Sequence, residues 1–415
     1  MIYESMTSII LRPHQETALS SMEENDLGKI ILPTGAGKSI VFIKNTIEQF
    51  QSDTPQTVCV VAPRILLAVQ LSADYEKYID NARFIHVHSG SRLHHYRTTK
   101  IEDIQEWHNI HKDQHKLIFT SYNSLKKITE SNIKVNTYNF DECHNSTKKS
   151  FFPHIEDAVK KADKKYFFTA TPKNSSIPTK KPGMNMTEVY GHDICKIPMT
   201  QMVDGGYVLP PLVVKKEVDF EENVDEMNNN LIIKTLDEDT PKKVLISAKS
   251  TKSIISLLTE TDFVSQMKDR DYSVLHITSM YGAFINGKQV KRDAFFRTLN
   301  EWGNDDSKKF VLLNYSILSE GINVSGLDAV IFLRNMDVIA MCQTIGRVIR
   351  LHKEDADRIA SDELLVGDYR NYKKPYGLVV LPISDDKSKV IASAVETVIY
   401  KSFVMGEVVS QEIIK

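Results

Sequence analysis

The sequence has few cysteines, no excess of charge of either sign and no long hydrophobic run. Its four cysteines, at positions 59, 143, 195 and 342, form no C-x-x-C pair, so neither a disulfide framework nor a zinc site is expected. The 52 lysines and arginines are offset by 54 acidic residues, which excludes a general basic field for holding nucleic acid and leaves only a local surface. No segment reaches the apolar length of a membrane helix. We therefore expect an intracellular protein with reduced cysteines and no membrane contact.

The chain is long enough for two hydrophobic cores, since it has 415 residues of which 41% are hydrophobic. Short apolar runs alternate with helix-like segments in both halves, which is typical of βα units around a parallel sheet. These runs lie at 29–32, 58–62, 116–120, 135–140, 166–169, 244–247, 273–277, 310–314, 329–333 and 378–382. The expected divisions are a first lobe over 1–205, a linker over 206–240, a second lobe over 241–385 and a C-terminal helix over 386–415 that packs on the second lobe.

A glycine-containing stretch at 33–39 lies between an apolar run and a helix-like segment. Glycines let backbone N–H groups approach phosphate closely, and the N-terminus of the following helix favours anions. Lys38 can then reach the β- and γ-phosphates of a nucleotide, and Ser39 can bind Mg²⁺. The general pattern has glycine where this chain has Leu32. The expected nucleotide-binding residues of this stretch are Pro33, Thr34, Gly35, Ala36, Gly37, Lys38 and Ser39.

Two adjacent acids, Asp141 and Glu142, directly follow the apolar run at 135–140. This position predicts that they lie at the carboxyl edge of the first sheet, where ligands bind. Asp141 is suited to hold Mg²⁺ through water, and Glu142 can orient and deprotonate an attacking water. Neighbouring acids in a loop are usually plain surface charge, but the phosphate-binding stretch upstream favours a hydrolytic site.

A basic stretch at 343–350 is the counterpart of this site in the second half of the chain. Arg347 and Arg350 are three residues apart, so on a helix both guanidinium groups would lie on one face and could reach a γ-phosphate. Such arginines stabilise the charge that develops during phosphoryl transfer. Gln343 would lie beside them near the attacking water. The alternative is a solvated basic helix face.

These stretches, in this order, resemble the motifs of superfamily 2 helicases. The segments that carry the resemblance are 11–15, 33–39, 120–125, 141–144, 169–172, 319–323 and 343–350. Five of these segments, 11–15, 120–125, 169–172, 319–323 and 343–350, look more like the motor subunits of type I and type III restriction enzymes and their phage and viral relatives. The helicase form of the phosphate-binding stretch is similar to Leu-Pro-Thr-Gly-Ala-Gly-Lys-Ser in this chain. The resemblance implies an α/β fold of two tandem RecA-like parallel-sheet lobes with an ATP cleft between them.

The resemblance also implies further nucleotide contacts, with ATP and Mg²⁺ as the cofactors. Gln15 would hydrogen-bond the adenine, although a polar residue that caps a helix would look the same. Gly321 and Asn323 fall in a segment that touches the ribose and the nucleic-acid backbone in this family. The Thr-Ala-Thr-Pro segment at 169–172 resembles the one that couples the state of ATP to strand binding.

Nucleic-acid contacts are implied in both halves of the chain. In the first half, the family grips the phosphate backbone with main-chain amides, hydroxyls and a basic side chain, which positions the strand without reading its sequence. Two serines in the second half are weaker signals, because serines at strand ends usually cap or turn the chain. The implied residues are Pro63, Arg64, Thr120, Tyr122, Ser247 and Ser279.

Taken together, the resemblance implies an ATP hydrolase that moves along nucleic acid as a helicase or translocase. The Asp-Glu-Cys-His-Asn run at 141–145 is also similar to that of the animal innate-immune RNA sensors. Those proteins carry a helical insertion in the second lobe and lack a Thr-Ala-Thr-Pro segment, so DNA is favoured over RNA here. An RNA-directed motor and a partner-dependent subunit of a larger complex stay open. The expected location is cytoplasmic, in the host cell if the source is a phage or virus.

Overall fold

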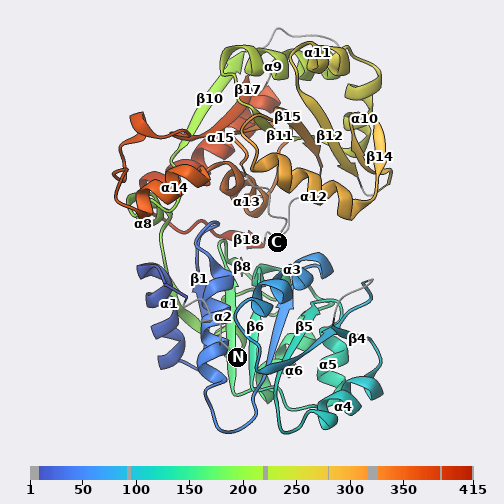
Figure 1. The fold of residues 1–415 in the computed structure, drawn as a ribbon, viewed down its shortest axis with the longest axis vertical. Coiled ribbons are helices and arrows are strands. Elements are labelled where there is room, and N and C mark those ends of the chain that lie inside the picture. Colours follow the sequence, from blue (N-terminus) through green and yellow to red (C-terminus); the bar gives the residue numbers. More distant parts are fainter. Residues whose placement is uncertain are drawn as a thin grey trace, which may run out of the picture. The chain divides into compact units, whose positions relative to one another are not determined.

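The computed structural model describes residues 9–90, 95–217, 223–278, 280–315, 326–383 and 386–413. The chain forms two compact units, the first made of residues 1–198 and 408–415 and the second of residues 199–407. Each unit is built around its own sheet (Figure 1). Within the described residues, no helix is long and apolar enough to cross a membrane.

The first unit contains an eight-stranded sheet in the order β4-β3-β5-β2-β6-β7-β1-β9. All of its strand pairs are parallel, so the carboxyl ends of the strands meet at one edge. The strands are β1 (Leu27–Ile31), β2 (Thr57–Ala62), β3 (Ala82–Val87), β4 (Tyr96–Thr98), β5 (His115–Ser121), β6 (Thr137–Phe140), β7 (Lys164–Thr169) and β9 (His192–Lys196).

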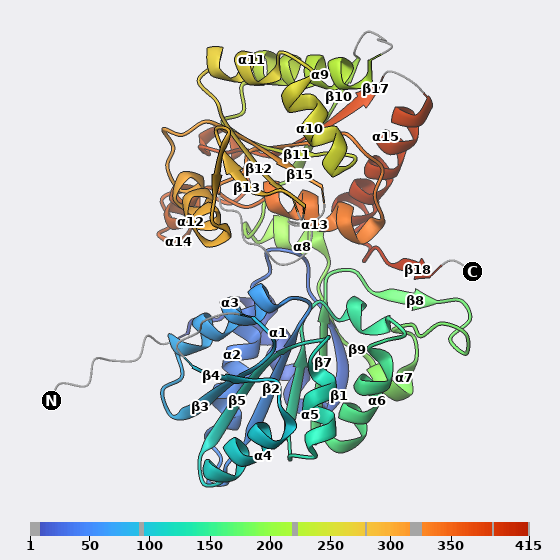
Figure 2. The same ribbon diagram turned by 90° about the vertical axis from the view of Figure 1, so that its right-hand side faces the viewer.

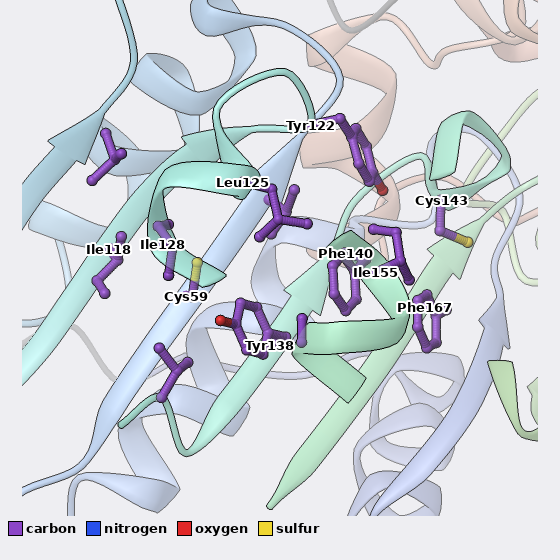
Figure 3. Close-up of a cluster of buried hydrophobic side chains, with 14 of the residues drawn as sticks. Cys59, Ile118, Tyr122, Leu125, Ile128, Tyr138, Phe140, Cys143, Ile155 and Phe167 are labelled. Atoms are coloured by element: carbon purple, nitrogen blue, oxygen red, sulfur yellow. The ribbon is translucent and has the colours of Figure 1, made fainter. Parts of the chain in front are cut away.

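Helices cover both faces of this sheet, because successive side chains of each strand point to opposite faces. Phe167 of β7 lies in the buried cluster that Figure 3 shows, whereas Phe168 meets Phe42 of α2, with ring centroids 4.2 Å apart. The helices that contribute to the cluster of Figure 3 are α4 (Ile101–Ile110), α5 (Leu125–Ser131), α6 (Phe152–Lys161) and α7 (Thr187–Tyr190). The remaining helices are α1 (Pro13–Glu24), α2 (Lys38–Gln49) and α3 (Ile65–Glu76).

The second unit contains another eight-stranded sheet, in the order β10-β17-β16-β11-β15-β12-β13-β14. The strands from β10 to β12 in this order are parallel, and a hairpin of β13 and β14 extends the sheet in antiparallel fashion. The strands are β10 (Pro211–Glu217), β11 (Lys243–Ser247), β12 (Ser273–Thr278), β13 (Gly282–Ile285), β14 (Lys288–Val290), β15 (Phe310–Asn314), β16 (Ala329–Phe332) and β17 (Gly377–Ile383).

Three helices of the second unit, α9 (Val224–Glu238), α10 (Thr251–Thr259) and α11 (Phe263–Asp269), share one buried cluster with the sheet. Figure 2 shows α12 (Arg292–Gly303) and α13 (Val338–Val348) on the opposite face of the sheet from α9. The other helical elements are α8 (Met199–Asp204), α14 (Lys353–Ala360), α15 (Asp386–Ile399) and the short turns η2 (Tyr369–Asn371) and η3 (Tyr400–Val404).

The stretch expected to be a linker, 206–240, differs from that expectation because it contains β10 and α9. Every residue of β10 pairs with a residue of β17, so this strand belongs to the second sheet. It lies at the edge of that sheet, and most of its side chains are partly or fully exposed. An edge strand of this kind does not form the continuous apolar run by which buried strands are recognised in a sequence.

The C-terminal stretch expected to pack on the second lobe divides in the structure. The helix α15 contacts β17 and α13 of the second unit. Beyond it, β18 (Gln411–Ile413) pairs in parallel with β8 (Lys173–Ser175), and Gln411 N donates to Pro172 O at 2.9 Å. Residues 408–415 therefore belong to the first unit. The helical spacing of apolar residues in α15 carries no information on these later residues.

Candidate nucleotide site

The stretch 33–39, which the sequence predicts to bind phosphate, follows β1 at the carboxyl edge of the first sheet. The stretch turns sharply, with Gly35 at φ 91° and Gly37 at φ 75°, a left-handed backbone region that glycine adopts without strain. The helix α2 begins at Lys38, and Gly37 is its N-cap. Glycine has no side chain that could cap the helix, so the N-terminus of α2 lacks a side-chain cap and is suited to an anion.

Lys38 and the two acids meet at this edge. Lys38 Nζ lies 2.7 Å from Glu142 Oε1, and each side chain is only 14% exposed. Burial disfavours the charge of Lys38, but Glu142 and Asp141 outweigh it and raise the pKa of this lysine. Burial and then the charge of Glu142 raise the pKa of Asp141 to about 7, against the opposing effect of Lys38. The charge of each of these three groups therefore shifts the pKa of its neighbours.

The backbone at Glu142 is held in an uncommon conformation. Its φ of 44° and ψ of 51° are left-handed, although Glu142 has a Cβ. Neighbouring side chains fix this turn: Tyr122 donates its hydroxyl to Asp141 O at 2.8 Å, and Asn145 Nδ2 donates to Glu142 O at 3.1 Å. A strained backbone conformation of this kind persists only where surrounding contacts hold it. In this conformation the Glu142 carboxylate points toward Lys38.

A chain of side-chain contacts connects the acids to the Thr-Ala-Thr-Pro segment after β7. His144, in the short helix η1 (Cys143–Thr147), lies with Nδ1 3.5 Å from Glu142 Oε2 and 3.0 Å from Thr169 Oγ1. Thr169 Oγ1 in turn accepts from Thr171 N at 3.1 Å and donates to Thr171 O at 3.2 Å. These contacts link Glu142 through His144 to Thr169, the last residue of β7, and through it to Thr171.

The surroundings of Asp141 fit the needs of Mg²⁺, and Ser39 lies next to Lys38 in the first turn of α2. Asp141 is only 6% exposed, and its Oδ1 has no hydrogen-bond partner among the described residues. A buried carboxylate oxygen without a donor is costly unless a cation occupies its surroundings. The described residues contain no group of three or more His, Cys, Asp or Glu side chains that could hold a metal. Mg²⁺ keeps several waters and is usually bound by one or two carboxylates together with phosphate oxygens of a substrate, so Asp141 and the hydroxyl of Ser39 would be its protein ligands.

Gln15 contacts the phosphate-binding stretch itself. Its Nε2 donates to Ala36 O at 3.0 Å, and its Oε1 accepts from Arg12 N at 2.9 Å. A Cβ on Gly37 would lie 2.4 Å from this Nε2, so a side chain at Gly37 would displace Gln15. His14, which the sequence did not single out, also contacts Ala36 O, at 2.9 Å from its Nε2. Burial lowers the pKa of His14, which keeps the ring neutral at pH 7.

The residues expected to complete the site from the second half lie on and after α13. Gln343 and Arg347 are buried residues of this helix, whose N-cap is Asp337. The helix ends at Val348, so Arg350 lies beyond it, and the argument from a shared helix face does not hold for Arg350. Its carbonyl accepts from Lys374 Nζ at 2.8 Å, which fixes the chain after the helix. Gly321 and Asn323 lie outside the described residues.

The structure places the expected nucleic-acid contacts unevenly. Pro63 and Arg64 connect β2 to α3 at the carboxyl edge of the first sheet. The side chains of Thr120 and Tyr122 are buried instead: Thr120 Oγ1 donates to Val87 O, and Tyr122 donates to Asp141 O, both at 2.8 Å. A nucleic-acid strand would therefore contact Thr120 and Tyr122 through their main-chain atoms. Ser247 lies at the end of β11, and Ser279 is outside the described residues.

The glycine-containing loop at 33–39 and the acids Asp141 and Glu142 lie at the carboxyl edge of one parallel sheet, and a second α/β unit follows; the fold is that of two tandem RecA-like lobes. The sequence profile of the family described as Type III restriction enzyme, res subunit, matches residues 8–174, and that of the Helicase conserved C-terminal domain matches residues 227–352. No curated protein sequence matches the chain. Two helicase family models thus match separate stretches of the chain, which confirms the resemblance to the superfamily 2 helicases and, over residues 8–174, to the type III restriction subunit.

Solved structures share the fold at low sequence identity. The ATP-dependent Type ISP restriction-modification enzyme LlaBIII bound to DNA has a TM-score of 0.71 and 16% identity, covering 96% of this chain and 30% of that one. A nuclease-deletion mutant of LlaGI, another Type ISP enzyme, in complex with a DNA substrate mimic has a TM-score of 0.58 and 18% identity, and the match covers 95% of this chain and 29% of that one. Dbp5 of S. cerevisiae bound to RNA and ADP BeF3 has a TM-score of 0.57 and 15% identity, and the match covers 97% of this chain and 90% of that one. The chain thus spans about three tenths of the length of the two Type ISP enzymes.

Proposed function

We propose that the protein hydrolyses ATP with Mg²⁺ and uses the energy to move along nucleic acid, with DNA as its track. The observation that carries this proposal is the contact of Lys38 with Glu142 beside the buried Asp141, directly at the phosphate-binding loop. In this proposal Glu142 orients and deprotonates the attacking water, while Ser39 and Asp141 hold the metal. Mg²⁺, when bound, would draw negative charge from the phosphate oxygens.

In this proposal, nucleotide binding and catalysis depend on the same lysine. Lys38 Nζ holds Glu142 at 2.7 Å, and a triphosphate on the loop competes for the same ammonium group. Phosphate binding thereby releases the Glu142 carboxylate to act as a base. The contacts from Glu142 through His144 to Thr169 give the change a route to the segment after β7, which we infer couples hydrolysis to the grip on a strand.

The second unit would complete the catalytic site. We assign Arg347 and Arg350 the role of stabilising charge on the γ-phosphate, and Gln343 a place near the attacking water. Gln15 would contact the adenine, and Gly321 and Asn323 the ribose. If both units hold the γ-phosphate, as this proposal requires, its loss on hydrolysis would change the affinity of the units for one another. Repeated closure and opening on a strand would then produce movement.

DNA is the preferred track because the two Type ISP neighbours were solved with DNA or a DNA mimic. RNA is the second candidate, since Dbp5 was solved with RNA. The test is an ATPase assay of the full chain with single- and double-stranded DNA and RNA at one stated salt concentration. We expect the strongest stimulation by DNA. Stimulation by RNA alone would assign the protein to RNA, and no stimulation by any nucleic acid would indicate a subunit that needs a partner.

A further inference from the structure

Three residues converge where neighbouring strands of the second sheet end. Ser247 ends β11, Tyr315 follows β15, and Arg334 follows β16; these strands are adjacent and parallel. The guanidinium carbon of Arg334 lies 4.7 Å from the ring centroid of Tyr315, and Arg334 Nε donates a long hydrogen bond, 3.4 Å, to Ser247 Oγ. The arginine is therefore held in one orientation by a ring and a hydroxyl.

Most of the hydrogen-bonding capacity of Arg334 is unused. A guanidinium group has five N–H donors, and in the described part of the chain only the one on Nε has a protein partner. Asp337, whose charge acts on Arg334, is engaged elsewhere, because it accepts from Ala340 N at 2.8 Å as the N-cap of α13. A partly buried, preoriented guanidinium without a bidentate acid is suited to a phosphate group.

Tyr315 adds an aromatic surface beside these donors. Its side chain is 38% exposed although it packs against Arg334. Exposed aromatic rings at the edge of a basic site stack on nucleobases without regard to their sequence. The pair thus offers the two kinds of contact that a single nucleotide of a strand requires, one for its phosphate and one for its base.

We propose that Arg334 and Tyr315, positioned by Ser247, bind one nucleotide of the nucleic-acid strand on the second unit, with Arg334 on its phosphate and Tyr315 stacked on its base. This inference rests on the proposed function and names a contact that the sequence motifs do not include. A phosphate on Arg334 could also come from ATP, so the experiment must separate the two sources.

The test compares full-length variants by fluorescence anisotropy with a labelled oligothymidylate over a range of salt concentrations. Arg334→Gln can still hydrogen-bond Ser247 but carries no charge, and we expect it to weaken binding about tenfold, with the slope of log K against log salt reduced by about 0.7. Arg334→Lys should keep the slope. Tyr315→Leu should weaken binding at least about fivefold with the slope unchanged, because stacking is not electrostatic. The matched control is Arg297→Ala, an exposed arginine on α12.

The outcomes separate this inference from the function on which it rests. If the wild-type protein binds the oligonucleotide but Arg334→Gln and Tyr315→Leu bind it equally well, the inference is wrong and the proposed function stands. A raised KM for ATP in Arg334→Gln with unchanged oligonucleotide binding also overturns it, since Arg334 would then serve the nucleotide. If the wild-type protein binds neither DNA nor RNA oligonucleotides, the proposed function fails first. Thermal unfolding close to that of the wild type shows that each variant is folded.

Discussion

At the scale of single residues, the ion pair of Lys38 and Glu142 is the contact on which the proposed hydrolysis depends most. Glu142→Gln keeps the size of the side chain but removes the base, so we expect turnover to fall by about 10²–10⁴-fold. ATP should still bind, and nucleic acid should be held more tightly because the triphosphate persists. Lys38→Ala should also abolish hydrolysis, since the phosphates lose their ammonium partner. Steady-state ATPase assays and titration with a fluorescent ATP analogue measure these effects.

Lys44→Ala provides the control for this pair of variants. Lys44 lies on the same helix as Lys38, but it pairs with Glu48 at 3.4 Å and not with the acids of the site. We expect it to hydrolyse ATP at the wild-type rate. Wild-type turnover in Glu142→Gln would remove Glu142 as the base.

Asp141 predicts a dependence of stability on pH. Burial and the charge of Glu142 raise its pKa to about 7 in the folded protein, whereas an aspartate in an unfolded chain has a pKa of about 3.9. Between these values the folded protein binds the additional proton, so this carboxyl group lowers the free energy of unfolding as pH rises through that window. Without Mg²⁺, Asp141→Asn should match the wild type near pH 4 and be more stable at pH 8 by up to about 4 kcal/mol, because each pKa unit corresponds to about 1.4 kcal/mol.

Urea unfolding at the two pH values measures this difference. Added Mg²⁺ at pH 8 should stabilise the wild type and leave Asp141→Asn nearly unchanged, because the amide is a poor ligand for the cation. Equal stability of the two proteins at pH 8 without Mg²⁺ would show that the ionised Asp141 is not held at an energetic cost.

At the scale of elements, the sequence predicts what is local and misses what depends on packing. The stretch at 33–39 and the acids after β6 are recognisable because their chemistry lies in adjacent residues. The edge strand β10 lacks a continuous apolar run, and the end of α13 before Arg350 has no punctuating glycine or proline. Arg334 follows β16 and Tyr315 follows β15, and these two strands lie on either side of β11 in the sheet. Because the two residues are far apart in the sequence, no sequence motif reveals their contact.

The connection between η1 and the end of β7 predicts a separable coupling function. Thr169→Val removes the hydroxyl that meets His144 Nδ1 at 3.0 Å and Thr171 N at 3.1 Å. Loss of a neutral hydrogen bond costs about 1 kcal/mol, so the protein should remain folded. We expect basal ATPase activity to persist and its stimulation by nucleic acid to fall, as measured by the ratio of the two rates.

The control for Thr169→Val is Thr46→Val. Thr46 is another buried threonine, and its hydroxyl donates to Phe42 O at 2.8 Å within α2. It should lower stability by a similar amount and leave the stimulation ratio intact. If Thr169→Val is stimulated as strongly as Thr46→Val, the contacts between the acids and the end of β7 do not carry the coupling.

At the scale of the whole molecule, the two units have separate hydrophobic cores, and the proposed catalytic groups are divided between them. A fragment of residues 1–198 contains the complete first sheet and the phosphate-binding loop, and a fragment of residues 199–407 contains the complete second sheet. We expect both to unfold cooperatively in circular dichroism, because each retains its own core. The first fragment should bind a fluorescent ATP analogue but hydrolyse ATP only at a trace rate.

The division also predicts how the arginines behave in the full chain. Arg347→Ala and Arg350→Ala should each slow hydrolysis by about 10²-fold or more, with ATP affinity changed far less, because they act on charge that develops during transfer. The control is Arg358→Ala on α14, whose Nη1 donates to Asn371 O at 3.3 Å. Steady-state turnover and the binding of a fluorescent ATP analogue are measured for all three arginine variants. Hydrolysis by the 1–198 fragment at the rate of the full chain would mean that the second unit contributes no catalytic group, and unchanged turnover in both arginine variants would remove their assigned role.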